Sequence, residues 1–376
     1  MKSQQRTKIY NLVRKLPRPL KNLVVEAIYQ IVNRDFKKAK TPLSINFFIT
    51  DNCNLRCSHC FYAGHLNKND KLKLENIRSI IKSLRNPLVS VVLTGGETFL
   101  RKDLLEICIL LDKINTKKII LATNGTMPDL IYDGVKKILE KTDLDVAVQI
   151  SIDGPEKIHD KIRGVPGTYK KAMLTIKKLK TIKNNKLTIS ASTTVSKTNY
   201  NYVEKTINEL KGTGIFHGLQ FVRSAGKQVF NIDKDLLSDF NSNKDFTLTI
   251  EQMEELSKII KTKVKNQEDP LLNRTINLLN EYFIKVLREK KRFMNCTAGY
   301  TDAVIYPDGN VSICEFTKPF ANLKDYDWNF YKLWTSKKAR EVRAKTKNCV
   351  CTHQCNLLNS LRYDKKSIKK LFENED

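Results

Sequence analysis

Between residue 43 and about residue 225, short runs of β-branched and other apolar residues alternate with stretches of helical periodicity. Six such pairs can be counted, and each ends in turn residues. This alternation predicts parallel strands joined by right-handed helical crossovers. Six units are fewer than a closed barrel contains, so we expect an α/β fold built on a partial (βα)6 TIM-like barrel, with the active site at the carboxyl ends of its strands. The expected strands are residues 43–50, 89–95, 119–124, 146–153, 187–195 and 219–223.

The expected barrel spans residues 43–225, and the rest of the sequence divides into three regions. Residues 1–42 are basic and amphipathic, and residues 226–292 are polar and then helical, as a bridging segment would be. Residues 293–376 are rich in cysteine and end in a basic tail. The turn at residues 307–310 lies between two short strand-like runs and predicts a β-hairpin. We therefore expect a small C-terminal cysteine-rich module after the barrel.

The chain is strongly basic, with 67 Lys and Arg against 40 Asp and Glu and a formal net charge of +27. Lysines occur in nearly every predicted helix, so a solvated basic surface is favoured and nucleic acid is not expected as a partner. Residues 1–40 hold eleven basic and two acidic residues and predict an amphipathic helix broken near Pro17 and Pro19. Docking of this helix on the chain's own domain is favoured, and peripheral contact with an anionic membrane stays open.

The nine cysteines indicate metal binding or catalysis more than disulfides, because the N-terminus shows no export signal and a reducing compartment is expected. No apolar run approaches the roughly 20 residues of a membrane span. We therefore expect a cytoplasmic location, with membrane association open. Three cysteines fall at 53–60 and three at 349–355, with Cys296 and Cys314 between these groups. Cys108 lies alone on an apolar helical stripe, where a buried structural cysteine is expected.

The first cysteine group, Cys53, Cys57 and Cys60, falls in the loop after the first expected strand. A [4Fe–4S] cluster normally takes four cysteines, so three thiolates leave one iron open for another ligand. The spacing of three and then two residues, with His59 before the last cysteine, resembles the signature of the radical S-adenosylmethionine (SAM) superfamily. The resemblance implies that these three cysteines hold the [4Fe–4S] cluster to which SAM binds.

Other segments resemble that superfamily in the same order along the chain, over residues 43–225. The segment Gly95-Gly96-Glu97 resembles the one that receives the amino group of SAM, although Thr98 stands where the family usually has proline. Arg163 matches an arginine that anaerobic sulfatase-maturating enzymes direct at the SAM carboxylate. The cofactor-binding residues implied by the resemblance are His59, Gly95, Gly96, Glu97, Asn124, Ser151, Asp153 and Arg163.

The second cysteine group resembles the SPASM or shorter twitch extension, which carries auxiliary iron–sulfur clusters. Its cysteines are Cys296, Cys314, Cys349, Cys351 and Cys355. Five thiols suffice for one auxiliary [4Fe–4S] cluster with one to spare. We expect Cys296 and Cys314 to be ligands together with two of the last three, and the spare thiol could donate a hydrogen atom to a substrate radical. A structural zinc site, with His353 as a candidate ligand, is the alternative.

The resemblance implies an oxidoreductase in which the reduced cluster cleaves SAM to a 5′-deoxyadenosyl radical that abstracts hydrogen from a substrate. Its partner would be a reductant such as flavodoxin or ferredoxin, and the outcome would be oxidation, epimerisation or a related reaction. Peptide maturases of this kind often carry a leader-binding domain before the barrel, and residues 1–42 are too short for one. We therefore expect a small-molecule, sugar or lipid-linked substrate. A peptide-modifying maturase is the second hypothesis, and a non-catalytic metal-cluster protein that binds nucleic acid is the third.

Overall fold

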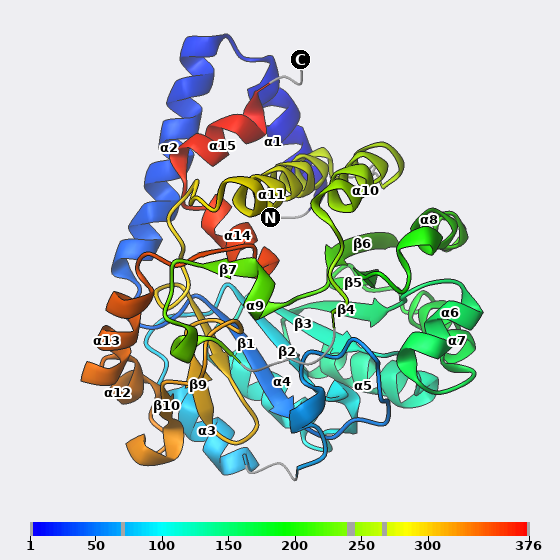
Figure 1. Ribbon diagram of the computed structural model, residues 1–376. Coiled ribbons are helices and arrows are strands. Elements are labelled where there is room, and N and C mark those ends of the chain that lie inside the picture. The colour runs from blue at the N-terminus through cyan, green and yellow to red at the C-terminus, as the bar shows by residue number, and fades with distance from the viewer. Residues whose placement is uncertain (1–2, 69–71, 239–244, 265–268, 374–376) are drawn as a thin grey trace.

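The computed structural model describes residues 3–68, 72–238, 245–264 and 269–373 (Figure 1). A nine-stranded sheet forms its centre, in the order β10-β9-β8-β1-β2-β3-β4-β5-β6. Strands β1 to β6 are parallel neighbours, which confirms the expected partial barrel. Their bounds are β1 Ser44–Thr50, β2 Ser90–Gly95, β3 Lys118–Thr123, β4 Asp145–Ser151, β5 Leu187–Val195 and β6 Phe216–Phe221.

Helices cover the outer face of the barrel strands, because every second strand residue there is apolar and buried. Each helix presents a stripe at helical spacing, as α3 does with Ile77, Ile80 and Ile81. The crossover helices are α3 Leu74–Lys82, α4 Leu104–Lys113, α5 Pro128–Lys141, α6 Glu156–Arg163, α7 Thr168–Leu179 and α8 Val203–Lys211. Cys108 is fully buried on α4, as its position on an apolar stripe predicts.

The inner face of the barrel carries uncharged polar side chains toward the carboxyl ends of its last three strands. Register places Gln149 of β4 beside Ser190 of β5, and Thr194 of β5 beside Gln220 of β6. These side chains are partly exposed, whereas their neighbours on the outer face are mostly buried. The barrel interior therefore offers hydrogen-bonding groups to a ligand at the end of the sheet where β6 forms the edge.

The last barrel strand begins three residues earlier than the sequence predicts, at Phe216 instead of residue 219. Gly218 interrupts the apolar pattern and hides the start of the strand, since a glycine in a strand provides no side chain to pack. The other five strands agree with their predicted positions to within two residues at either end.

The N-terminal segment forms two helices, α1 Ser3–Lys15 and α2 Arg18–Lys38, which meet at Pro17 as predicted. They dock on α11 (Pro270–Glu289) and α15 (Lys365–Phe372), which belong to the second half of the chain. Tyr10, Val13 and Val25 are buried there against Ile368 and Phe372. The helices therefore lie on the chain's own domain, the favoured alternative. Among the described residues, none of the helices combines the length and the apolar character of a membrane span.

The C-terminal region continues the sheet of the barrel. Its strand β8 (Asp302–Ile305) pairs in parallel with β1, and β9 (Asn310–Ser312) and β10 (Ala321–Asn322) follow in antiparallel order. The predicted hairpin at residues 307–310 connects β8 and β9, and its Gly309 has a φ of 86°. The remaining elements are α9 Ala225–Gln228, β7 Val229–Phe230, α10 Ile250–Lys263, α12 Phe330–Trp334, α13 Lys337–Thr346, β11 Val350–Cys351 and α14 Gln354–Leu361.

Candidate functional site

The loop that follows β1 carries Cys53, Cys57 and Cys60 at the carboxyl edge of the sheet. All three are free and partly buried. Burial raises the pKa of the Cys53 thiol, and burial together with the neighbouring Cys57 raises the pKa of Cys60 to about 12. These thiols therefore need a nearby cation to become thiolates, which is what an iron cluster provides. The donor set fits a cluster that takes three cysteines.

Two glycines at the end of β2 allow the cysteine loop to pack directly on the backbone. Gly96 N donates to Thr50 O over 2.8 Å, and Glu97 N donates to Asn52 O over 2.7 Å. A Cβ atom on Gly96 would lie 2.1 Å from Asn52 O, and one on Gly95 would lie 2.1 Å from Thr50 O. The glycine pair thus holds the start of the loop against β2, and larger residues would push it away.

Replacing Gly96 with alanine should therefore displace the cysteine loop and lower the iron content of the anaerobically reconstituted protein severalfold. Forcing a methyl group against backbone typically costs about 1–3 kcal/mol of stability. Iron analysis and a thermal melt measure both effects. Gly64→Ala is the matched control, because Gly64 follows the same cysteines and a Cβ there meets no atom within 4 Å. Equal iron loss in both variants would contradict the role assigned to Gly96.

Glu97 is buried and links three segments through its carboxylate. Its Oε1 accepts hydrogen bonds from Phe99 N at 3.2 Å and Thr123 Oγ1 at 2.7 Å, and its Oε2 accepts from Asn124 N at 2.7 Å. Burial raises the pKa of this carboxyl despite these donors. The side chain therefore ties the end of β2 to the end of β3, in addition to any contact it makes with a cofactor.

Asn124 reaches from the end of β3 back to the cysteine loop. Its Nδ2 donates to Asn54 Oδ1 over 2.8 Å, and Asn54 Nδ2 in turn donates to Thr126 Oγ1 over 2.9 Å. Asn54 lies between Cys53 and Cys57 and was not among the predicted site residues. Its place inside the cysteine motif is the only sequence signal that could have pointed to it.

Asp153 and Arg163 form a buried ion pair beside the first cysteine group, with 2.5 Å between Asp153 Oδ2 and Arg163 Nη2. Arg163 Nη1 also donates to Cys57 Sγ over 3.5 Å, and His59 Nε2 lies 3.6 Å from the same Asp153 oxygen. Burial alone would raise the pKa of Asp153, but Arg163 and His59 hold it below its usual value. Residues 59, 153 and 163, which the sequence offers as separate candidates, thus form one charged network.

His159 completes this network and was missed by the sequence reasoning. Its Nδ1 accepts from Asp153 N over 3.0 Å, and burial lowers its pKa to about 4. It precedes Arg163 by four residues on α6, so both side chains project from one helix face. His59 Nδ1 and Arg163 Nε are buried polar atoms without a hydrogen-bond partner in the described protein, which marks a place where a polar ligand fits.

Ser151 ends β4 on the inner face of the barrel, where it pairs in register with Ser192 of β5. It is partly exposed, and Asp153 follows it two residues later at the same edge of the sheet. The candidate residues of the first group therefore lie along the carboxyl ends of β1 to β4, and Arg163 reaches this edge from α6.

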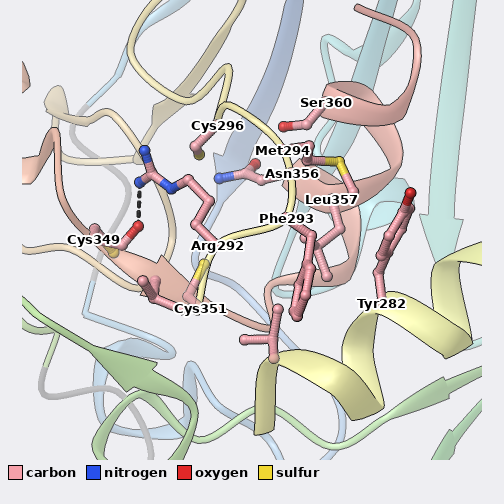
Figure 2. A pocket seen from close by; sticks show the side chains of 12 residues that line it. Tyr282, Arg292, Phe293, Met294, Cys296, Cys349, Cys351, Asn356, Leu357 and Ser360 are labelled. Atoms are coloured by element: carbon pink, nitrogen blue, oxygen red, sulfur yellow. Dashed lines mark hydrogen bonds between the residues drawn. The ribbon is translucent and has the colours of Figure 1, made fainter. Parts of the chain in front are cut away.

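Four cysteines of the second group are linked by electrostatic interactions with one another. Burial and then Cys351 raise the pKa of Cys296, and burial followed by Cys351 and Cys296 raises the pKa of Cys314. The pKa of Cys351 is raised first by a hydrogen bond with the Cys349 thiol and then by burial. Figure 2 shows Cys296, Cys349 and Cys351 lining one pocket, with Arg292 among them. Arg292 donates to the carbonyl oxygens of residues 347 and 349, and so holds the loop that precedes β11.

Cys355 belongs to a polar network centred on Arg223, which also interacts with Cys314. Arg223 Nη2 donates to its Sγ over 3.4 Å, and Arg223 Nη1 donates to Glu315 Oε2 over 2.5 Å. The guanidinium of Arg223 also lies 5.1 Å from the ring centre of Phe61, which directly follows Cys60. The network therefore lies between the two cysteine groups.

His353 has little capacity left for zinc, because both of its ring nitrogens are engaged. Nε2 lies 2.7 Å from Glu315 Oε2, and Nδ1 accepts from Asn356 N at the start of α14. Glu315, His353 and Cys355 place ligand-type atoms within 4.8 Å of one another, but the Arg223 cation already pairs with this carboxylate. The geometry therefore disfavours a zinc ion there, since the arginine would repel it.

Known protein families match both cysteine regions of the chain. The Radical SAM superfamily model matches residues 47–210, and an iron–sulfur cluster-binding domain, SPASM, matches residues 296–356. The chain is similar to the subtilosin biosynthesis protein AlbA of Bacillus subtilis, with 26% identity over 89% of this chain and 72% of AlbA. It is also similar to the sporulation killing factor maturation protein SkfB of the same species, with 24% identity over 82% of this chain and 69% of SkfB.

Among solved structures, the fold resembles Streptococcus suis SuiB bound to the precursor peptide SuiA, with a TM-score of 0.57. That likeness covers 92% of this chain and 76% of SuiB at 15% identity, and it concerns the fold alone. The partial barrel and its cysteine loop define an iron–sulfur enzyme that uses SAM. The chain belongs to the radical SAM superfamily and carries a C-terminal SPASM domain. Its cofactors are accordingly SAM and a [4Fe–4S] cluster, together with the auxiliary iron–sulfur clusters that a SPASM domain implies.

Proposed function

We propose that this radical SAM enzyme modifies a peptide. The observation that carries the proposal is the extent of the match to AlbA and SkfB, which covers 89% and 82% of this chain and so extends well beyond the barrel. By their names, one relative serves the biosynthesis of a bacteriocin and the other the maturation of a killing factor. These relatives favour the second hypothesis, a peptide, over the small-molecule, sugar or lipid-linked substrate that we expected from the sequence.

In this proposal Cys53, Cys57 and Cys60 hold the cluster to which SAM binds. The single auxiliary cluster takes four ligands, and the proximity of four thiols supports Cys296, Cys314, Cys349 and Cys351. Cys355 is then the spare thiol, held by Arg223. The residues proposed to contact SAM are His59, Gly95, Gly96, Glu97, Asn124, Ser151, Asp153 and Arg163.

In this proposal the protein residues orient the reactants and fix a positive charge near the cluster ligands. When bound, the reduced cluster and SAM supply the radical that removes a hydrogen atom from the substrate, with electrons from a reductant such as flavodoxin or ferredoxin. The ion pair between Asp153 and Arg163 fixes a positive charge beside Cys57. Gln149, Ser190 and Gln220 offer uncharged hydrogen-bonding groups on the inner face of the barrel, which suit the amide groups of a peptide backbone.

The test is to incubate the anaerobically reconstituted chain with SAM, dithionite and synthetic copies of the short peptides encoded beside its gene. We expect one peptide to change in mass by mass spectrometry, with 5′-deoxyadenosine formed alongside, and neither change with Cys57→Ala. Formation of 5′-deoxyadenosine that rises with a sugar or lipid extract, while every peptide keeps its mass, would overturn the peptide assignment and leave the superfamily assignment intact.

A further inference from the structure

The helical pair α1 and α2 buries one side against the protein and exposes apolar residues on another. Tyr10, Val13 and Val25 face α11 and α15 and are at most 4% exposed. Leu12 and Leu23 are 64% and 66% exposed. Together with Ile9, Leu20 and Ile31, they make up half of the strongly exposed large apolar side chains among the described residues, although the two helices form only about a tenth of the chain.

Basic residues gather at the turn between the helices. A groove at this turn is lined by Asn11, Arg14, Lys15, Leu16, Arg18 and Lys21. The first 25 residues of the sequence contain no acidic residue. The first acidic residue is Glu26, whose Oε2 lies 2.5 Å from Lys365 Nζ. The turn therefore combines exposed leucines with a cluster of basic side chains. In Figure 1 it lies at one extreme end of the molecule, where a flat surface could reach it.

We propose that the turn formed by α1 and α2 is a docking site for an anionic phospholipid bilayer. Lipid phosphates would bind the basic side chains, and Leu12, Leu20 and Leu23 would enter the boundary between headgroups and acyl chains. A second copy of this chain is disfavoured, because two such positive surfaces repel each other. Nucleic acid would satisfy the charge, but its phosphates would leave the three leucines in water. The proposal is independent of the substrate and of the peptide assignment.

The test measures co-sedimentation of the full-length reconstituted protein with phosphatidylcholine vesicles, with and without phosphatidylglycerol. We expect binding only to the vesicles that contain phosphatidylglycerol, and weakening by added salt. The triple variant Leu12→Gln, Leu20→Gln and Leu23→Gln should bind at least about tenfold more weakly, because the apolar contribution is lost. Replacing Arg14, Lys15, Arg18 and Lys21 with glutamine should weaken binding by on the order of 100-fold.

Leu130→Gln with Leu174→Gln is the matched control, since these leucines are 49% and 45% exposed on α5 and α7. The control should bind vesicles like the unchanged protein, and thermal melts should show that all variants fold. Absence of binding to anionic vesicles by the unchanged protein would overturn the proposal. So would equal binding by the leucine variant, which would place the contact elsewhere on the basic surface. A dimer in solution that only the leucine variant disrupts would replace the bilayer with a second copy.

Discussion

The Cys57→Ala variant is expected to form no measurable 5′-deoxyadenosine from SAM under dithionite, whereas the unchanged reconstituted protein forms it. With two thiols left in the loop after β1, the cluster that opens one iron to SAM lacks a ligand. The same substitution removes the sulfur to which Arg163 donates. Chromatography of the reaction mixture measures the product, and iron analysis should show a loss of about four iron atoms per chain, one [4Fe–4S] cluster.

Cys108→Ala is the control for this experiment. Cys108 is fully buried on α4, away from both cysteine groups, and burial raises its pKa well above the usual value for a thiol. This variant should keep its iron and its activity and lose only a little stability. Product formation by Cys57→Ala at the unchanged rate would refute the assignment of Cys57 as a cluster ligand. Loss of activity in both variants would mean that cysteine loss acts through folding.

Replacing Asp153 with alanine is expected to destabilise the protein by about 3–5 kcal/mol, the usual cost of leaving one partner of a buried ion pair alone. Asp153 is fully buried, and Arg163 is 9% exposed, so the guanidinium would lose its partner without gaining water. The backbone of Thr194 would also lose the Asp153 oxygen to which it donates over 3.0 Å. Chemical denaturation of the iron-free chain, compared with the unchanged iron-free chain, measures this loss.

The surface pair of Lys178 and Asp129 provides the comparison. Asp129 is mostly exposed, and an exposed pair contributes little to stability, so Asp129→Ala should unfold at the same denaturant concentration as the unchanged chain. Equal stability of the Asp153→Ala and Asp129→Ala variants would mean that Arg163 finds another partner or reaches water. Asp153→Asn keeps the shape of the side chain and should lie between the two variants.

The architecture of the barrel was largely predictable, because parallel strands buried on their outer face leave a strong pattern of apolar runs and helical stripes. Gly218 shows where this approach fails, since a residue without a side chain interrupts the pattern within β6. The pairing of β8 with β1 was not predictable from local sequence. It joins Ser44 to Asp302, which are more than 250 residues apart, and depends on how the two halves meet in space.

The candidate site was predictable where a motif fixed the spacing and not where side chains meet through the fold. The three cysteines after β1 follow from their spacing, but the pairing of Asp153 with Arg163 brings the end of β4 to α6. Likewise, five cysteines after residue 290 could not be sorted by sequence. The structure shows different partners for them, since Cys349 hydrogen-bonds to Cys351 whereas Arg223 donates to Cys355.

The parallel pairing of β8 with β1 also decides how this chain can be divided. Residues 44–47 bond on one side to β2 and on the other to residues 302–305, so the strand that leads into the first cysteine loop is an interior strand. If the chain ended at residue 292, β1 would become an edge strand with unpaired backbone groups, which promotes aggregation. The barrel and the cysteine-rich region thus share one continuous sheet, and a cut between them would expose the backbone of β1.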